Sequence, residues 1–292
     1  MSNKFIYYCL RLYYIKVLTL IIIMIEINKI YNENCLDTMS RMEDNFIDLT
    51  VTSPPYDNLR TYNGYEFDFE SIAKELFRVT KKGGVVVWVV GDATINGSET
   101  GTSFKQALYF KEIGFNLHDT MIYKSNKPPL THNRYEQCFE YMFVFTKQYL
   151  NTFNPLLEKC IYAGSNNKRP NTLKGSRAQN SAMRTRNKDI NNTKDTKYIN
   201  NVWDYKTGDS LTTCDNFAFE HPAMFPEKLA QDHIYSWSDK GDLVYDCFTG
   251  SGTTLKMAIK QDRNFIGSEI SGEYCKIAQK RIDNELQKIK MF

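Results

Sequence analysis

"DLVYDCFTGSGTTLKMAIKQ", residues 242–261, decides the fold, because it joins a short apolar strand to a helix through a glycine turn. The strand ends at Asp246, and the turn contains Gly250 and Gly252. A further strand, NFIGSEI, follows the helix and ends near Glu269. A strand–turn–helix–strand unit of this kind is typical of an open α/β sheet that binds a ligand at the turn.

This turn predicts a site for a nucleoside-bearing cofactor. The first N–H groups of the helix point at such a ligand, and a carboxylate at the end of the next strand can accept hydrogen bonds from ribose hydroxyls. Glu269 stands 19 residues beyond Gly250, which suits that contact. A plain turn between strand and helix is the alternative, since a lone G-x-G is a weak signal. Leu255 replaces the third glycine of the dinucleotide fingerprint, which argues against NAD.

A second strand end, VTSPPY at residues 51–56, is unusual because two prolines follow the strand. Pro54 and Pro55 have no N–H, and Pro55 keeps the residue before it extended. Ser53 and the stiffened carbonyls therefore offer hydrogen-bond acceptors without competing backbone donors, which suits a ligand with an exocyclic amine. Tyr56 offers a flat face on which a ring can stack. A proline-stiffened turn that binds nothing is the alternative.

The rest of the chain alternates between short strands and amphipathic helices. This alternation predicts an α/β fold, a doubly wound and mostly parallel sheet with helices on both faces. The helix over 68–84 is expected to end on two lysines and a glycine pair, a good helix stop. Further strands are predicted at 26–34, 46–53, 85–90, 115–124 and 140–146, and further helices at 35–42, 103–113, 221–237 (entered through Pro226) and 272–289.

The composition is that of an ordinary globular protein, with 292 residues, 42% hydrophobic and 24% charged residues and a net charge of +3. The seven cysteines are scattered, odd in number and never spaced as C-x-x-C, and the four histidines show no ligand spacing. This usage indicates reduced thiols in a cytoplasmic protein and argues against a metal site.

The N-terminal residues 1–23 require a separate interpretation. VLTLIIIMI at 17–25 is strongly apolar, but it is far shorter than the roughly 20 residues that span a membrane. No small-residue cleavage site follows it, as a signal peptide requires, so we expect no membrane segment. Met24 opens a sequence that reads as a natural start, so residues 1–23 are upstream sequence or an extension on one interpretation. A genuine N-terminal strand or helix is the other.

Positive charge is concentrated in one segment. Residues 159–197 contain ten Lys or Arg against two Asp, a net charge of +8, whereas the whole chain carries +3. The segment is also polar and lacks helix or strand periodicity. A solvated linker is one reading, and a basic arm that contacts phosphates is the other.

Taken together, TSPPY after a strand and D-x-F-x-GSGTT near the C-terminus resemble the amino-methylating DNA methyltransferases that use S-adenosylmethionine. The order of the motifs is similar to the β arrangement of that family, over about residues 26–285. The resemblance implies a methyltransferase-type sheet with the cofactor motif in the C-terminal part of the chain. It divides the chain into an N-terminal extension (1–23), a target-base half (24–150), a basic target recognition region (151–215) and a cofactor-binding half (216–292).

The resemblance also implies roles for individual residues. Glu269 would bind the ribose, and Asn34, which stands where relatives often have an acidic residue, would contact the adenine. The target base would be held by Ser53, Pro54, Pro55 and Tyr56. The cofactor would be held by Asp246, Phe248, Gly250, Ser251, Gly252, Thr253, Glu269, Phe225, Pro226 and Asn34. DNA would be contacted by Lys168, Arg169, Lys174, Arg177, Arg184 and Arg186.

The implied reaction is methyl transfer to the exocyclic amine of a base that has been flipped out of double-stranded DNA. Family members with serine before the prolines mostly act on cytosine N4 and those with aspartate on adenine N6, so Ser53 favours cytosine and leaves adenine as the alternative. The chain has no Pro-Cys pair, which argues against carbon-5 methylation of cytosine. A restriction–modification system with a cognate endonuclease is the expected setting.

Two less favoured functions are a methyltransferase of RNA or protein and an inactive DNA-binding partner. The first class usually carries asparagine before the prolines and places the cofactor motif first. The second is disfavoured by the intact Ser53, Tyr56, Asp246 and Glu269. The sequence indicates neither a recognition site nor an oligomeric state.

Overall fold

The computed structural model describes residues 25–55, 67–126, 135–160, 195–208, 211–221 and 224–290. They belong to two compact units: one runs up to Asn154 and resumes at Asn201, and the other is Pro155–Asn200. In the smaller unit, strands β8 (Leu157–Lys159) and β9 (Thr196–Tyr198) pair antiparallel. Tyr56, the extension 1–23 and the six predicted DNA contacts between Lys168 and Arg186 lie outside the described residues.

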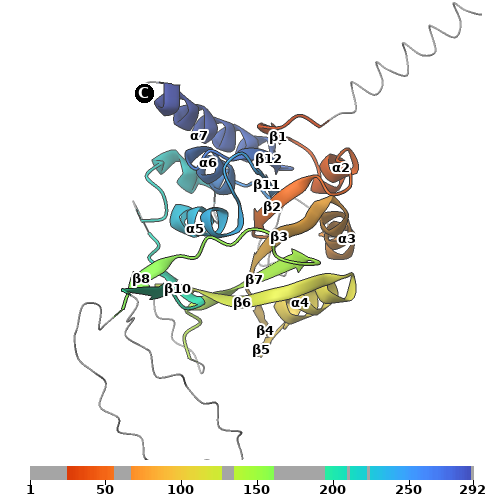
Figure 1. The fold of residues 1–292 in the computed structure, drawn as a ribbon, viewed down its shortest axis with the longest axis vertical. Helices are drawn as coiled ribbons and strands as arrows, with labels where there is room; N and C mark the ends of the chain where they lie inside the picture. Colours follow the sequence, from red (N-terminus) through yellow and green to blue (C-terminus); the bar gives the residue numbers. More distant parts are fainter. Residues whose placement is uncertain are drawn as a thin grey trace, which may run out of the picture. The chain divides into compact units, whose positions relative to one another are not determined.

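The larger unit is built on an eight-stranded sheet (Figure 1) in the order β1-β12-β11-β2-β3-β7-β6-β10. The strands from β1 to β3 in this order are parallel, β7 is antiparallel to both neighbours, and β10 is parallel to β6. This confirms the predicted doubly wound, mostly parallel sheet. Its strands are β1 (Lys29–Tyr31), β2 (Ile47–Thr52), β3 (Thr80–Val90), β6 (Phe115–Ser125), β7 (Phe139–Lys147), β10 (Val202–Tyr205), β11 (Leu243–Asp246) and β12 (Asn264–Ser268); β4 (Thr94–Ile95) and β5 (Ser98–Glu99) form a separate hairpin.

Helices cover both faces of the sheet, as predicted (Figure 1). On one face lie α2 (Cys35–Ser40), α3 (Phe69–Val79) and α4 (Thr102–Glu112). On the other, α5 (Glu227–Trp237), preceded by the short helix η1 (Asn216–Glu220), packs on α6 (Thr253–Lys260), which packs on α7 (Gly272–Lys290). None of the described helices has both the length and the apolar character needed to cross a membrane.

The core beneath α2–α4 explains why these segments are helical. Apolar residues recur in α3 at a spacing that places Ile72 and Leu76 on one buried face, and Asp68 caps the helix by accepting from the Ser71 N–H at 3.2 Å. These side chains pack with Trp88 of β3 in one apolar cluster. Burying a side chain of leucine size stabilises the fold by about 2 kcal/mol.

The prediction that the helix over 68–84 continues to the Lys-Lys-Gly-Gly sequence was wrong. α3 ends at Val79, and Thr80, which is already extended, begins β3. The Thr80 hydroxyl donates to the Leu76 carbonyl at 2.6 Å and closes the last helical turn. The pairing of β2 with β3 shifts register over the next residues, so they form a bulge in which Gly83 takes a φ of +84°. A glycine pair after two lysines suits a bulge as well as a helix end.

The order of the strands places the site. Strands β12 and β1 lie on one side of β11, and β2 and β3 lie on its other side. The strand order therefore reverses between β11 and β2. In open α/β sheets, ligands bind outside the C-terminal ends of the strands at such a reversal. Asp246 ends β11 and Thr52 ends β2, so the two predicted motifs meet at this edge.

Candidate active site

The glycine turn between β11 and α6 approaches its neighbours closely. Gly250 and Gly252 have φ values of +51° and +81°, a left-handed conformation that favours glycine. A Cβ on Gly252 would lie 2.9 Å from the Cβ of Ala278, so the turn rests directly on α7. Gly252 precedes α6 as its cap residue and provides no side-chain cap. The first-turn N–H groups are therefore available to a polar group at the edge of the sheet.

Glu269 holds this turn from the end of β12. One carboxylate oxygen accepts from the Gly250 N–H and the other from the Ser271 N–H, both at 2.8 Å. Burial raises the pKa of Glu269, although these backbone hydrogen bonds oppose the shift. Each carboxylate oxygen can accept a second hydrogen bond, so Glu269 can fix the turn and also bind a hydroxyl.

Asp246 ties the cofactor motif to the strand that carries the proline pair. Its Oδ1 accepts from the Thr52 hydroxyl at 2.7 Å and from the Phe248 N–H at 3.1 Å. Only 2% of Asp246 is exposed, and burial raises its pKa to about 6 against the opposing effect of the Thr52 hydrogen bond. Its carboxylate therefore faces β2 and the base of the turn.

The proline pair follows Thr52 directly. Ser53 and Pro55 are half-buried and Pro54 is buried, at the C-terminal end of β2. The predicted amine-binding peptide thus begins one residue after the residue that is hydrogen-bonded to Asp246. The structure brings Ser53, Pro54 and Pro55 to the sheet edge that also carries the glycine turn.

Phe248 belongs to an aromatic cluster beside the turn. Its ring packs edge-on against Phe67, at 5.7 Å between centroids, and against Trp88 of β3, at 6.2 Å. It is only partly buried. Phe248 therefore gives the edge of the sheet an apolar wall next to the end of β2.

The remaining predicted cofactor residues are placed as follows. Asn34 follows β1 and caps α2, since its Oδ1 accepts from the Leu36 N–H at 2.9 Å. Phe225 is half-buried, and the buried Pro226 is the cap residue of α5. The side chains of Ser251 and Thr253 face Arg281 of α7, because both hydroxyls accept from its guanidinium.

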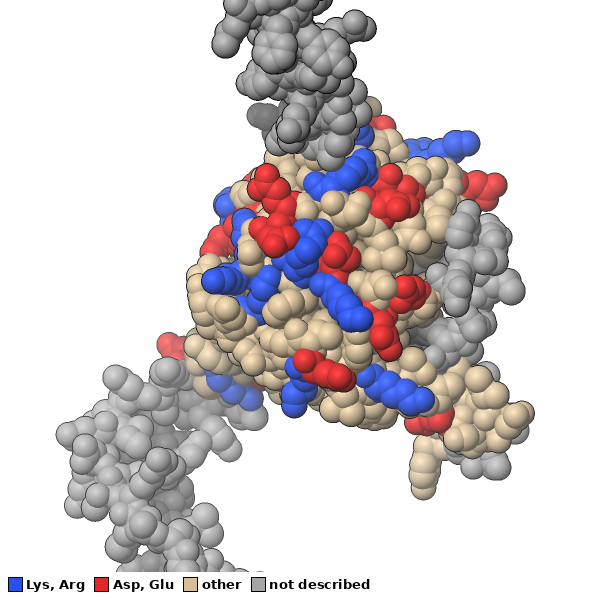
Figure 2. All heavy atoms as spheres, turned by 90° about the vertical axis from the view of Figure 1, so that its right-hand side faces the viewer, with Lys and Arg blue, Asp and Glu red and all other residues tan. Residues whose placement is uncertain are grey.

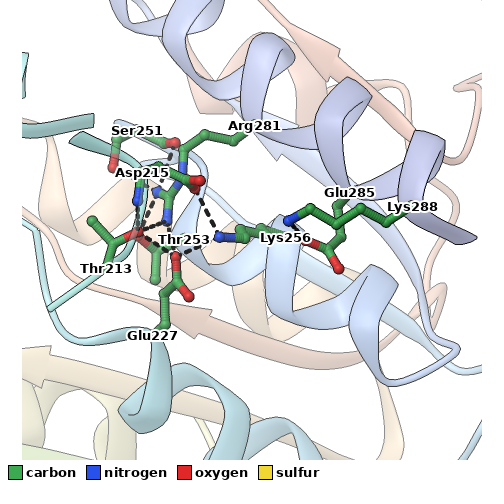
Figure 3. Close-up of polar contacts among 9 residues, drawn as sticks. All are labelled: Thr213, Asp215, Glu227, Ser251, Thr253, Lys256, Arg281, Glu285 and Lys288. Atoms are coloured by element: carbon green, nitrogen blue, oxygen red, sulfur yellow. Dashed lines mark hydrogen bonds and ion pairs between the residues drawn. The ribbon is translucent and has the colours of Figure 1, made fainter. Parts of the chain in front are cut away.

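A cluster of four buried or half-buried charges lies behind the turn (Figure 3). It consists of Arg281, Lys256, Asp215 and Glu227, and we call it the charge cluster. Arg281 is fully buried, and both cations contact both carboxylates at 2.6–2.9 Å. Burial alone would raise the pKa of Asp215 and Glu227, but the hydrogen bonds from Lys256, with those from Arg281 to Asp215 and Thr213 to Glu227, lower both.

Sequence reasoning missed Thr52 and the whole charge cluster. Lysines and glutamates in a predicted helix usually indicate side chains that are exposed to solvent. One signal was present: Arg281 stands three residues after Ala278 and one before Ile282, on the face of α7 that carries these two buried apolar residues. A charge on such a face indicates a buried partner.

The site fits a nucleoside-bearing cofactor. The N-terminus of α6 offers N–H donors, and Glu269 offers acceptors beside it. The face of the molecule that carries α2, α3 and α4 shows Lys and Arg interspersed with Asp and Glu (Figure 2).

The comparisons with known proteins agree with this geometry. The family described as DNA methylase matches residues 47–280, most of the chain and both motifs. The chain belongs to this family of DNA methylases. Membership confirms DNA as the substrate and S-adenosylmethionine as the cofactor that the sequence predicted.

Individual relatives and solved structures match most of the length of this methylase. The orphan methyltransferase M.BamHII of Bacillus amyloliquefaciens is 54% identical over 241 residues, which cover 82% of this chain and 89% of that protein. The structure of the cytosine-N4-specific PvuII DNA methyltransferase is similar with a TM-score of 0.64 at 19% identity, covering 91% of this chain and 93% of that one. A Thermus thermophilus protein, crystallised with S-adenosyl-L-methionine, gives 0.59 at 20% identity and covers 88% and 93%. These structural likenesses establish the fold.

Proposed function

We propose that this methylase transfers a methyl group from S-adenosylmethionine to the exocyclic N4 amine of a cytosine flipped out of double-stranded DNA. One observation carries the proposal: the hydrogen bond from Thr52 to Asp246 joins the Ser-Pro-Pro strand end to the glycine turn. An amine acceptor and a cofactor can therefore be bound at one edge of one sheet.

The cofactor half of the site would bind at the turn. Glu269 would accept from the ribose hydroxyls while it holds Gly250, and Phe248 would provide an apolar wall. Phe225 and Pro226 would pack beside the cofactor, and Asn34 would lie near the adenine. When bound, S-adenosylmethionine supplies a methyl group on a sulfonium that is already activated for transfer.

The target half of the site would orient the amine. An exocyclic amine is a poor nucleophile because its lone pair is delocalised into the ring. Hydrogen bonds from the amine to Ser53 and to a proline-stiffened carbonyl favour a localised lone pair directed at the methyl group, and holding the two groups together supplies much of the acceleration. Tyr56 would stack on the ring and offset part of the cost of flipping the base.

Cytosine is favoured over adenine by Ser53. The serine precedes the proline pair, the position at which related enzymes with aspartate mostly act on adenine N6. Both amines offer two N–H donors, so the adenine N6 amine is the second candidate for the same site.

DNA would be contacted by the basic segment 159–197, which holds ten Lys or Arg against two Asp. We propose that the enzyme acts in the cytoplasm as the modification component of a restriction–modification system. Relatives named Type II methyltransferases, such as M.MthZI of Methanothermobacter thermautotrophicus at 28% identity, support this setting, whereas the name of the orphan relative M.BamHII favours action without an endonuclease.

The test is to incubate the purified protein with DNA and methyl-labelled S-adenosylmethionine and to identify the modified nucleoside by mass spectrometry. Label in N4-methylcytosine supports the proposal. Label in N6-methyladenine selects the second candidate. Transfer to RNA or protein with none to DNA overturns both.

A further inference from the structure

The guanidinium of Arg281 reaches three segments of the chain at once (Figure 3). Its NH1 donates to the Ser251 carbonyl at 3.0 Å, to the Ser251 hydroxyl at 3.1 Å and to the Thr253 hydroxyl at 3.0 Å. Its Nε donates to Asp215 at 2.9 Å, and its NH2 donates to Glu227 at 2.6 Å. One planar group thus connects the glycine turn to the segment that precedes η1 and to the start of α5.

Lys256 makes this arrangement rigid. Its ammonium contacts Asp215 at 2.7 Å and Glu227 at 2.8 Å, the same two carboxylates that Arg281 contacts. Thr213 closes the cluster, since its hydroxyl donates to Glu227 and accepts from the Asp215 N–H. Each carboxylate is therefore held from two sides, and the guanidinium plane has little freedom to rotate.

A cluster of this kind is a poor way to gain stability alone. Removing four charges from water is costly, and well-packed apolar residues of similar size often serve stability as well or better. What the cluster does provide is geometry, because a guanidinium presents its donors in a fixed fork. Here the fork fixes Ser251, the residue between the two left-handed glycines.

We propose that Arg281 is a positioning residue that sets the conformation of the turn at Gly250–Gly252 and thereby the affinity for S-adenosylmethionine. It acts through Ser251 and touches no reacting atom. Without the fork, the turn samples other conformations, and the fraction of molecules with a binding-competent turn falls. Apparent affinity falls in proportion to that fraction. The inference rests on the proposed binding of the cofactor at this turn.

The test compares Arg281→Lys with Lys288→Met. Lysine keeps the charge but cannot bridge Ser251 and both carboxylates, so the variant loses the fork. Lys288 is an exposed residue of the same helix, paired with Glu285 at 3.2 Å and away from the turn (Figure 3), so its variant loses an ion pair without touching the cluster.

Two readouts are measured on folded protein well below the unfolding temperature. In Arg281→Lys the dissociation constant of S-adenosylmethionine rises about 10-fold, while the turnover number at saturating cofactor stays within about 2-fold of wild type. In the protein without cofactor, amide hydrogen exchange accelerates about 10-fold in the turn, 246–254, and is unchanged in β3. Lys288→Met leaves all of these at wild-type values. A role in stability alone would instead accelerate exchange throughout the larger unit.

Unchanged affinity and unchanged local exchange in folded Arg281→Lys would overturn the inference, and so would acceleration spread evenly over the sheet. If Arg281→Lys does not fold, Asp215→Asn, which removes charge from one side of the fork, takes its place with the same expected direction. A wild-type protein that binds no S-adenosylmethionine would contradict the proposed function, whereas the exchange result would still report on the fork.

Discussion

The Thr52 hydroxyl donates a 2.7 Å hydrogen bond to Oδ1 of Asp246, across 194 residues of sequence. Thr52 is the last residue of β2 and Asp246 the last of β11, and both are buried. Because Ser53 follows the first and the glycine turn follows the second, this contact and the pairing of β2 with β11 hold the Ser-Pro-Pro strand end and the glycine turn at one edge of the sheet.

Thr52→Val removes this donor and keeps the shape of the side chain. We expect the free energy of unfolding to fall by about 2 kcal/mol, since the bond is buried and its acceptor is a carboxylate. Thr50→Val on the same strand is the matched control, because the Thr50 hydroxyl is buried with no partner among the described residues. That variant should be as stable as wild type or more so. If urea unfolding shows that both variants lose the same free energy of unfolding, the hydrogen bond between Thr52 and Asp246 does not stabilise the fold.

Asp246→Asn tests the burial of the carboxylate. Burial raises the pKa of Asp246 from 3.8 to about 6. Between these two pH values the folded state therefore keeps a proton on Asp246 that the unfolded state has released. The stability that this group contributes is therefore present below about pH 4 and lost as the pH rises through about 6. The asparagine does not titrate.

We therefore expect the unfolding free energy of wild type minus that of Asp246→Asn to fall by about 2 to 3 kcal/mol between pH 4 and pH 7.5. Urea unfolding of both proteins at several pH values measures it. A difference that stays constant, or that grows with pH, would mean that the carboxylate is not held in a desolvated site.

The basic segment 159–197 is expected to make the affinity for DNA depend on salt concentration. If Lys168 and Arg169 each neutralise a DNA phosphate, replacing both with alanine should reduce the slope of log affinity against log salt concentration by about 2. Replacing Lys105 and Lys111, two exposed residues of α4, is the control and should leave the slope unchanged. Fluorescence anisotropy with a DNA duplex measures both, and a wild-type affinity insensitive to salt would remove the segment from the interface.

The fold could be predicted from the sequence wherever local pattern decides the structure. The run from Asp242 to Gln261 carries its own strand, turn and helix signals, and the structure confirms them as β11 and α6. The Lys-Lys-Gly-Gly sequence shows the limit of local pattern. Two lysines and two glycines end a helix or form a bulge equally well, and the pairing of β3 with β2 decided for the bulge.

The site was predictable only in part, because local sequence pattern indicates some of its residues and not others. Glycine permits left-handed backbone conformations that other residues rarely adopt, and proline fixes φ, so Gly250, Gly252 and Pro55 could be recognised without knowing their neighbours. The roles of Thr52 and Arg281 depend on partners far away in the chain. A threonine in a strand carries no local mark of a buried contact. The place of Arg281 beside buried apolar residues of its helix indicates a buried partner, but it does not indicate which residues of the chain that partner contains.

We propose that one site, assembled from two distant motifs, binds the cofactor at the glycine turn and orients the amine at the Ser-Pro-Pro strand end. Single-turnover methyl transfer to DNA at saturating S-adenosylmethionine, measured for Ser53→Ala alongside the cofactor dissociation constant, tests it most directly. We expect the rate to fall about 100-fold, as for loss of one preorganised hydrogen bond to a reacting group, with the dissociation constant within about 2-fold of wild type and with Ser53→Thr, which keeps the hydroxyl, close to wild type. A Ser53→Ala enzyme that transfers methyl at the wild-type rate, or whose cofactor affinity falls as much as its rate, would contradict the account.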